Sequence, residues 1–388
     1  MKSAYKIMVV AGESSGDLHA AKLIKALRES APDTSFEFFG AASQKLRDAG
    51  VEPIVNADDL SVVGMLEIGR SLPMFWKALR DLKRAALERE PVAVILVDFP
   101  DFNLKLAKSL KRKGLKVIYY ISPQFWAWRK YRVKTIYKYV DLVITILPFE
   151  KDWYARQGIH NVEYVGSPLA KEVRASLSKQ EFCSKHDLDL SMPIISLLPG
   201  SRHKEIVRIL PLLLEGGALM EGKNGNIQFI IALASGRTLH EAARAIEQSS
   251  ASPKTVLIVQ NETYDALNAS DAAAVTSGTA TLETGIIGTP MVIVYKTSAL
   301  NYALLRPMIS VEHFGLVNLI AGERVAKELI QGDFTPPALS KELLRLLEPK
   351  VNRKMREKLK TVTDRLGHGG ASKRAARAIL DLLAETRQ

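Results

Sequence analysis

The sequence has a single cysteine, Cys183, and no long hydrophobic run. One cysteine excludes a disulfide within the chain and any metal site built from several cysteines. The longest apolar runs, such as residues 227–234, fall far short of the roughly 18–20 residues that a membrane-spanning helix needs. The N-terminal apolar run leads into Glu13 and Asp17 rather than into a small-residue cleavage site, so it predicts a first strand and not a signal peptide. These absences favour a cytoplasmic protein.

Acidic residues are also missing from one long stretch of a basic chain. The 388 residues include 54 Lys or Arg and 42 Asp or Glu, a formal net charge of +12. Eleven Lys or Arg and no acid lie between Asp101 and Asp141, and ten more basic residues lie from Lys350 to Arg377. Local positive charge attracts phosphate on nucleic acid, on anionic lipid or on a small substrate. Composition alone leaves all three open.

Short apolar runs alternate with amphipathic, helix-length segments along the chain, whose 47% hydrophobic and 25% charged residues are typical of globular proteins. The runs are too apolar to be half exposed, which predicts buried parallel strands with helices on both faces. The candidate strands are residues 6–11, 36–40, 92–98, 116–122, 141–147, 194–200, 227–234, 255–260, 272–277 and 291–296. The predicted fold class is therefore α/β, with two doubly wound Rossmann-like domains facing a cleft.

The alternating pattern loosens around residues 166–193, which predicts a junction between the domains. We expect an N-terminal domain over residues 1–168 and a C-terminal domain over residues 169–349. The helical pattern of residues 350–388 is expected to pack back on the N-terminal domain. Because ligands bind at the carboxyl ends of parallel strands, motifs at strand ends are the candidate sites.

Two such motifs belong to the N-terminal domain. The motif GESSGD at 12–17 follows the first strand and opens a helix, where free N–H groups attract anions, but its glycine spacing fits neither a Walker loop nor a dinucleotide fingerprint. A capped turn without a ligand explains it equally well. The motif VDFPDFN at 97–103 ends a buried strand, so a partly desolvated Asp98 is a candidate general base. Asp101 fits a helix cap better.

Residues 119–132 interleave aromatic rings with cations. Such a pattern stacks bases of single-stranded nucleic acid, or anchors a protein at a bilayer surface, although half of the rings could simply be core. No nucleic-acid-binding signature accompanies it, so we expect no nucleic-acid partner. The candidate membrane-docking residues are Phe125, Trp126, Trp128, Arg129, Lys130 and Arg132.

Two motifs of the C-terminal domain together predict a nucleotide diphosphate site. LPGSR at 198–202 follows a strand, and Arg202 can bind a diphosphate with two parallel hydrogen bonds. SGTATLE at 277–283 starts another helix, and its Glu283 can accept both hydroxyls of a ribose. The seven histidines show no metal-ligand spacing, so we expect no metal.

Seven motifs taken together resemble a known family. They are GESSGD at 12–17, VDFPDFN at 97–103, SPQFWAWR at 122–129, LPFEK at 147–151, LPGSR at 198–202, SGTATLE at 277–283 and NLIAGE at 318–323. In this order and spacing they closely resemble the lipid-A-disaccharide synthases, inverting glycosyltransferases of lipopolysaccharide assembly. The resemblance extends from about residue 6 to GASKRAA at 370–376.

The resemblance implies a glycosyltransferase B fold that uses neither a catalytic metal nor a cofactor. Such enzymes transfer 2,3-diacylglucosamine from UDP-2,3-diacylglucosamine to 2,3-diacylglucosamine 1-phosphate (lipid X), forming a β(1→6) disaccharide and releasing UDP. It implies that Asp98 is the base for the acceptor hydroxyl, with Glu13 as second candidate, and that Arg202 stabilises the departing diphosphate. The expected substrate-binding residues are Ser15, Gly16, Asn103, Gly200, Ser201, Arg202, Gly278, Thr279, Glu283 and Asn318.

Both substrates of that family carry acyl chains, so the resemblance implies a cytoplasmic enzyme that docks peripherally on the anionic inner membrane. Residues 60–76 and 304–316 are candidate acyl contacts, with core packing as an equal explanation. A member of the family exchanges its C-terminal part in a dimer, which leaves a homodimer open. The alternatives are another UDP-sugar enzyme of the same fold, such as a UDP-N-acetylglucosamine epimerase, or a basic nucleic-acid-binding protein.

Overall fold

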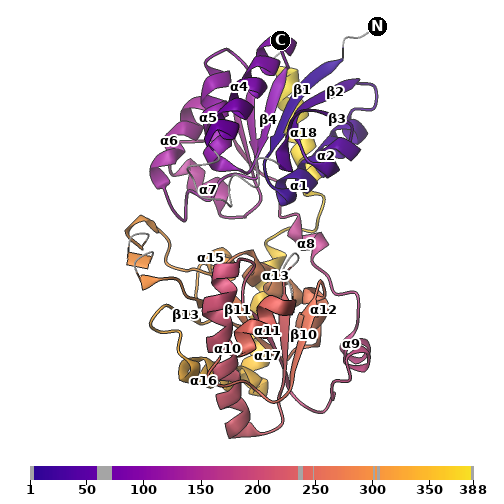
Figure 1. Ribbon diagram of the computed structural model, residues 1–388. Coiled ribbons are helices and arrows are strands. Elements are labelled where there is room, and N and C mark those ends of the chain that lie inside the picture. The colour runs from indigo at the N-terminus through magenta and orange to yellow at the C-terminus, as the bar shows by residue number, and fades with distance from the viewer. Residues whose placement is uncertain are drawn as a thin grey trace. The chain divides into compact units, whose positions relative to one another are not determined.

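The computed structural model describes residues 4–58, 72–234, 239–247, 249–299, 302–303 and 306–385. The chain forms two compact units, each with its own parallel sheet (Figure 1). Unit 1 combines Met1–Pro168 with His368–Gln388, and unit 2 is Leu169–Gly367. Two parallel sheets flanked by helices confirm the predicted α/β class. The candidate acyl contacts at residues 60–71 and 304–305 lie outside the described residues.

The sheet of unit 1 has the strand order β3-β2-β1-β4-β5-β6-β7, and all its pairings are parallel. Its strands are β1 (Tyr5–Ala11), β2 (Phe36–Ala42), β3 (Val51–Asn56), β4 (Ala93–Val97), β5 (Val117–Tyr120), β6 (Leu142–Thr145) and β7 (Val162–Tyr164). The strand order reverses between β1 and β4, where Ala11 pairs with Val97. The residues that follow these two strands therefore leave the sheet side by side, at the position where doubly wound sheets bind ligands.

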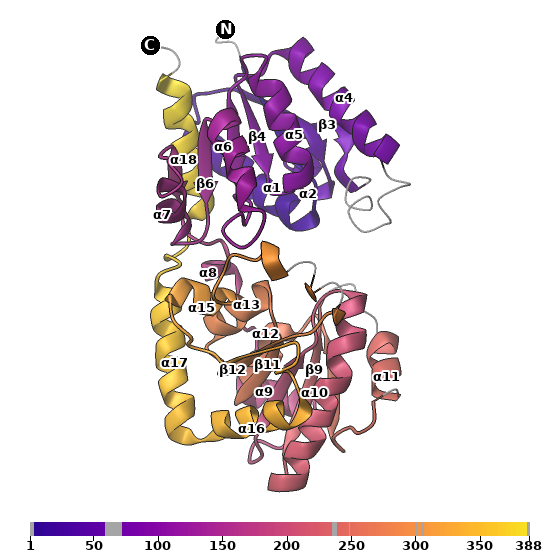
Figure 2. The same cartoon turned by 90° about the vertical axis from the view of Figure 1, so that its left-hand side faces the viewer.

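Helices cover both faces of this sheet (Figure 2). The helical elements of unit 1 are α1 (Ser14–Ser30), α2 (Gln44–Asp48), α4 (Leu72–Arg89), α5 (Pro100–Lys111), η1 (Lys130–Arg132), α6 (Val133–Tyr139), α7 (Glu150–Ala155) and α18 (Ala371–Ala384). Buried residues of α4, α5 and α6 pack on one face, and the apolar stripe of α1 packs with α18 on the other. This double cover explains why every residue of β4 and β5 is buried.

The sheet of unit 2 has the order β10-β9-β8-β11-β12-β13 and is also parallel. Its strands are β8 (Ile194–Leu198), β9 (Gln228–Leu233), β10 (Val256–Gln260), β11 (Ala272–Thr276), β12 (Met291–Tyr295) and β13 (Glu328–Ile330). Its helical elements are α8 (Leu169–Glu172), α9 (Lys179–Lys185), α10 (His203–Asn224), α11 (Leu239–Glu247), α12 (Thr263–Ala269), α13 (Thr279–Ile287), η2 (Arg306–Met308), α15 (Leu316–Ala321), α16 (Pro336–Leu347) and α17 (Pro349–Asp364). The order reverses at β8 and β11, so the loops after these strands are neighbours.

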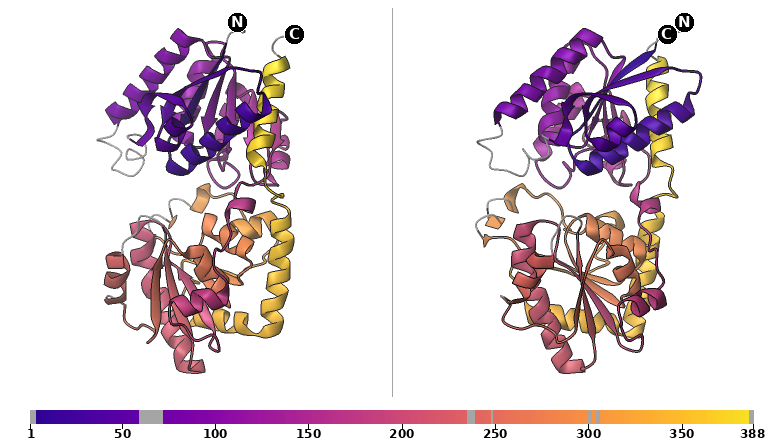
Figure 3. Two further views of the ribbon diagram at one scale, coloured as in Figure 1. Left: turned by 90° about the vertical axis from the view of Figure 1, so that its right-hand side faces the viewer. Right: turned by 45° about the vertical axis from the view of Figure 1, so that its right-hand side comes forward.

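The last two helices belong to different units, which corrects the expectation for residues 350–388 (Figure 3). Helix α18 lies in unit 1, where Arg374 Nε donates a hydrogen bond of 2.8 Å to Val165 O. Helix α17 instead buries Met355 and Leu359 in unit 2, where Met355 Sδ accepts the Met291 N–H at 3.2 Å. The apolar face of α17 fits unit 2, and the chain crosses only after it. None of the described helices is long and apolar enough to cross a bilayer.

Candidate active site

The turn after β4 carries the candidate base in an unusual backbone conformation. Asp98 and Phe99 both have φ of +48°, a left-handed region that costs a residue with a side chain about 1–2 kcal/mol. Pro100 follows and begins α5. Such strain persists only where the surroundings fix it, and it is found most often at functional sites. The conformation lifts Asp98 out of the strand at the carboxyl edge of the sheet.

The Asp98 carboxyl is mostly buried, and this changes its acidity. Burial, followed by the nearby negative charge of Glu13, raises its pKa from 3.8 to about 6, while a hydrogen bond from the Phe99 main chain opposes the shift. A carboxylate with a pKa near 6 is ionised at neutral pH and accepts a proton more readily than an ordinary aspartate. The structure thus brings the two predicted carboxylates, Asp98 and Glu13, into electrostatic contact.

The GESSGD motif contributes space and charge to the same edge. An added Cβ on Gly12 would lie 2.2 Å from the Phe99 ring, so this glycine allows the turn after β1 to approach the turn after β4. Glu13 is exposed and precedes α1 without a capping hydrogen bond from its side chain. Ser15 is exposed on the first turn of α1, whereas Gly16 is buried and has room for a Cβ.

Asp17, the last residue of that motif, is structural. Its buried carboxylate accepts the main-chain N–H groups of Ser43 and Lys45, each at 2.8 Å, and that of Leu46 at 3.2 Å. These donors lie at the start of α2, so Asp17 satisfies N–H groups that a helix leaves unpaired. Asp17 therefore caps α2 rather than α1, the helix in which it lies.

Two of the residues predicted to bind substrate, Asn103 and Asn318, form hydrogen bonds with the protein itself. Both side chains are fully buried and bound to the chain itself. Asn103 Nδ2 donates to Val97 O and Asp98 O. Asn318, on α15, exchanges two hydrogen bonds with the main chain of Ala326 and donates to Glu328, which fixes the loop between α15 and β13. The Nδ2 group of each residue thus makes both of its hydrogen bonds within the protein, whereas Asn103 Oδ1 is buried without a partner.

The loop after β5 is anchored by a carboxylate that the sequence analysis overlooked, Glu150. Its Oε1 accepts Trp126 Nε1 at 3.0 Å and Ser122 Oγ at 3.3 Å, and its Oε2 accepts the main-chain N–H groups of Ile146 and Leu147. Burial raises the pKa of Glu150 to about 7, although the hydrogen bonds from these four donors oppose the shift. The LPFEK motif contained this residue, but nothing local in the sequence predicts its distant partners.

Two of the six predicted membrane-docking residues are therefore core residues. Phe125 and Trp126 are 3% and 4% exposed, the first packed under α5 and the second bound to Glu150. Trp128 and Lys130 are exposed, as docking requires.

The two arginines among the predicted membrane-docking residues form ion pairs with one acidic residue. Arg129 and Arg132 both form ion pairs with Asp101, at 3.3 and 2.5 Å. Asp101 thus binds these two arginines instead of capping α5, for which no side-chain cap is found. The pairing reduces the positive charge that this segment presents to a membrane.

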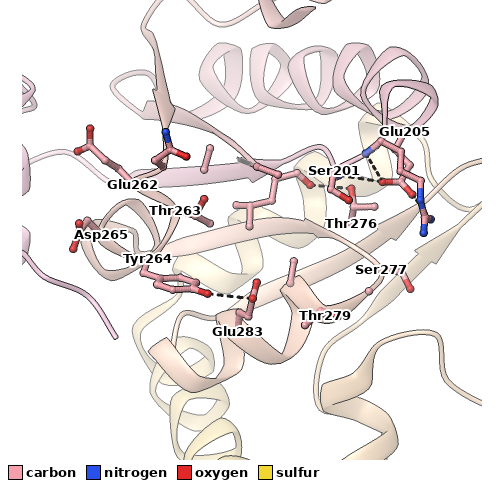
Figure 4. A pocket seen from close by; sticks show the side chains of 18 of the residues that line it. Ser201, Glu205, Glu262, Thr263, Tyr264, Asp265, Thr276, Ser277, Thr279 and Glu283 are labelled. Atoms are coloured by element: carbon pink, nitrogen blue, oxygen red, sulfur yellow. Dashed lines mark hydrogen bonds and ion pairs between the residues drawn. The ribbon is translucent and has the colours of Figure 1, made fainter. Parts of the chain in front are cut away.

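Unit 2 contains a pocket of about 560 Å³ at the carboxyl ends of β8 and β11 (Figure 4). Such a volume suits a small-molecule ligand. Most of the predicted binding residues of this unit line it: Gly200, Ser201, Arg202, Gly278, Thr279 and Glu283. Residues 261–265, which follow β10, complete the wall and were not predicted. The sequence feature that could have identified these residues is their position directly after a strand.

The turn predicted to bind diphosphate already holds a carboxylate. Glu205 Oε2 accepts the N–H groups of Ser201 and Arg202 at 3.1 and 3.2 Å, and its Oε1 lies 3.1 Å from Arg202 Nη1 (Figure 4). Gly200, at φ of +106°, allows this approach, because a Cβ there would lie 2.5 Å from Glu205 Oε2. The turn therefore binds an anionic group in this structure, and the guanidinium of Arg202 remains largely exposed.

Glu283 points toward Tyr264 across the pocket, and the two side chains share a hydrogen bond of 3.2 Å (Figure 4). Burial raises the pKa of Glu283, and the hydrogen bond from Tyr264 opposes that shift. One carboxylate oxygen remains available to a ligand's hydroxyl groups. Among the described residues, no group of three or more His, Cys, Asp or Glu side chains could hold a metal ion.

Solved structures share this fold. A putative UDP-N-acetylglucosamine 2-epimerase from Listeria monocytogenes matches with a TM-score of 0.67 at 14% identity, over 99% of this chain and 98% of that one. The calicheamicin glycosyltransferase CalG4 matches with a TM-score of 0.60, also at 14% identity, over 99% of both chains. Likeness at this identity defines the class of fold alone, the two-sheet α/β fold of glycosyltransferase B enzymes.

Sequence relatives define the family. A family model described as lipid-A-disaccharide synthetase matches residues 7–381. The lipid-A-disaccharide synthase of Trichlorobacter lovleyi is 40% identical over 382 residues, and that of Syntrophus aciditrophicus 42% over 381 residues, each covering 98% of both chains. The chain belongs to the lipid-A-disaccharide synthetase family. This membership confirms the resemblance read from the seven motifs and the predicted enzyme class, a glycosyltransferase of lipid A biosynthesis.

Proposed function

We propose that this enzyme transfers 2,3-diacylglucosamine from its UDP derivative to the 6-hydroxyl of 2,3-diacylglucosamine 1-phosphate, with inversion and release of UDP. The observation that carries the proposal is Asp98, a buried carboxylate with a pKa near 6 on a strained turn of a chain in this family. Inversion needs a base on the attacking hydroxyl and a stabilised leaving group. We assign the base to unit 1 and the residues that stabilise the leaving group to unit 2.

In unit 1, Asp98 removes the proton of the acceptor hydroxyl as that oxygen attacks the sugar carbon. A raised pKa favours this transfer, because the carboxylate is poorly solvated and gains by accepting a proton. Glu13 keeps the pKa high by its charge and stays exposed itself. We assign Asp98 the role of base and Glu13 a supporting electrostatic role. Ser15, which is exposed on the first turn of α1, is a candidate for a contact with the acceptor.

In unit 2, the pocket holds the UDP part of the donor. The diphosphate would take the place of the Glu205 carboxylate at the Ser201 and Arg202 N–H groups, and Arg202 would bind it with its exposed guanidinium. Gly278 and Thr279 begin α13 at the opposite wall. Glu283 would accept the ribose hydroxyls with its remaining oxygen. Arg202 and the turn thereby stabilise the charge that develops on departing UDP, without a metal ion.

The acylated substrates place the enzyme at an anionic membrane surface, and unit 1 has a suitable face. We call basic aromatic surface the exposed residues Trp76, Trp128, Lys130, Tyr131, Lys134, Tyr137 and Lys138. Lys105, on α5, adds a further cation beside Trp76, since its Nζ lies 4.9 Å from the centre of the Trp76 ring. Each free cation near such a surface contributes about 1 kcal/mol of attraction. Rings at the headgroup level add to this.

The reaction is tested by incubating the purified protein with UDP-2,3-diacylglucosamine and lipid X in the presence of EDTA, and by analysing the products by mass spectrometry. We expect disaccharide 1-phosphate and UDP. Unacylated UDP-N-acetylglucosamine is the control, because an epimerase of this fold would convert it. Conversion of that sugar, or absence of disaccharide while UDP still binds, would reject the proposal.

Membrane docking is tested by sedimentation with vesicles of phosphatidylglycerol or of phosphatidylcholine alone. We expect binding to the anionic vesicles that salt weakens and that the triple variant Trp128→Ala, Tyr131→Ala, Tyr137→Ala loses. Leu190→Ala, which removes an exposed apolar side chain from unit 2, is the matched control. Binding that ignores both lipid charge and salt would contradict the assignment.

A further inference from the structure

The main-chain carbonyl of Asp98 receives two hydrogen bonds from buried side chains. Tyr119 Oη donates to it at 2.6 Å and Asn103 Nδ2 at 2.8 Å. Both side chains are fully buried, one in the centre of β5 and the other on α5. The main-chain N–H of Asp98 donates to Tyr120 O at 3.1 Å. The main-chain polar groups of this one residue thus bind the turn to two elements, β5 and α5.

These contacts oppose the strain of the turn. Two consecutive non-glycine residues at φ of +48° favour relaxation toward ordinary backbone angles. Relaxation would rotate the Asp98 carbonyl away from Tyr119 and Asn103 and leave buried donors unpaired, which is costly. The direction of the Asp98 side chain follows from its backbone angles. The two donors therefore determine where the carboxylate points.

We propose that Tyr119 and Asn103 are positioning residues for the base, which hold the Asp98 carboxylate toward the acceptor through its main-chain carbonyl. The inference depends on the proposed role of Asp98 as that base. Neither residue touches the substrate, since both lie in the interior of unit 1. Misplacing a catalytic group by about 1 Å can cost about 100-fold in rate, so a modest relaxation of the turn is enough to matter.

Two features favour positioning over simple core packing. Burial raises the pKa of Tyr119 well above its usual value, so the hydroxyl keeps its proton and remains a donor at every working pH. Asn103 Nδ2 also donates to Val97 O at 3.2 Å, so a single amide spans the last residue of β4 and the first residue of the turn. An apolar side chain would fill either space equally well without making these bonds.

The test is a double-mutant cycle of Tyr119→Phe and Asp98→Asn, with the disaccharide product as readout. Tyr119→Phe removes one hydroxyl and keeps the ring. We expect it to lower kcat by about 10- to 100-fold with KM for either substrate within about twofold. In the Asp98→Asn background the same change should have no further effect on kcat, because the group that it positions is gone.

Tyr154→Phe is the matched control, since Tyr154 is another fully buried tyrosine of unit 1 and its hydroxyl does not bond Asp98. It should leave kcat unchanged. A second cycle combines Asn103→Ala with Asp98→Asn and so tests the other donor. If Asn103→Ala fails to fold, the cycle with Tyr119→Phe decides the test. A kcat of Tyr119→Phe equal to that of Tyr154→Phe, or an equal loss with and without Asp98, would overturn the inference. Near-normal turnover of Asp98→Asn would instead reject the proposed base.

Discussion

The acid limb of the pH–rate profile tests the electrostatics of the Asp98 site most directly. The base must be ionised to accept a proton, and burial with the charge of Glu13 raises its pKa from 3.8 to about 6, a shift of about two units. At pH 5 about one molecule in ten then has an ionised Asp98, and kcat/KM should fall about tenfold for each further unit. An unshifted aspartate would give full activity down to about pH 4.

The perturbation that separates the two causes is Glu13→Gln, which removes a negative charge and keeps the shape of the side chain. Burial and the charge of Glu13 both raise the pKa, and burial is the larger of the two causes. Removing the charge should therefore lower the pKa of Asp98 and move the acid limb to lower pH. Glu13 is exposed, so added salt should screen its effect and reduce the difference between variant and wild type.

The assay is kcat/KM for disaccharide formation between pH 4.5 and 8, with Glu37→Gln as control, since Glu37 is an exposed acid of the same sheet. Unfolding linked to Asp98 cannot produce the limb. A carboxyl with a raised pKa stabilises the fold most at low pH and loses that contribution as pH rises from 3.8 to about 6. Full activity of the wild type down to pH 5, or an unmoved limb in Glu13→Gln, would refute the reasoning.

Three further variants test other parts of the site. Arg202→Ala should weaken UDP binding at least tenfold in calorimetry. Glu205→Gln should instead tighten UDP binding, because the carboxylate that occupies the turn loses its charge. Unchanged affinities would count against the diphosphate assignment. Gly12→Ala puts a Cβ 2.2 Å from the Phe99 ring and should lower kcat while the UDP affinity measured in parallel stays constant. Glu150→Gln replaces an acceptor oxygen by a donor among buried N–H groups and should cost about 1–3 kcal/mol in chemical denaturation; wild-type stability would show that its partners are satisfied otherwise.

The fold was largely predictable because its central strands are buried on both faces. Apolar runs such as residues 92–97 are typical of strands of this kind, and they identified most of both sheets. The edge strands β3 and β7 were missed, since Glu52 and Glu163 interrupt short segments that face solvent on one side. The basic surface of α17 gave no indication of which unit its apolar face would join.

The site was predictable in its position but not in its internal partners. A strand ending in Val-Asp-Phe-Pro indicates a turn, and proline disfavours a helical conformation in the residue before it, yet nothing local predicts left-handed angles at Asp98 and Phe99. The Asp98 carbonyl of this turn is bound by Tyr119, twenty-one residues further along the chain. The burial of Trp126 depends similarly on Glu150. Long-range partners decide which polar and aromatic residues of a motif face a ligand and which face the core.

Among the described residues, three carboxyls that are wholly or partly buried have a raised pKa for the same physical reason, and their hydrogen-bond donors separate their roles. Glu150 accepts four hydrogen bonds from the protein, which compensate its burial and make it structural. Glu283 accepts one, from Tyr264, and keeps an oxygen for a ligand. Asp98 accepts one from the Phe99 main chain, while the side-chain donors around it bind its carbonyl instead. Because few protein donors compensate the burial of the Asp98 carboxylate, binding a proton stabilises it. The acceptor hydroxyl can supply that proton.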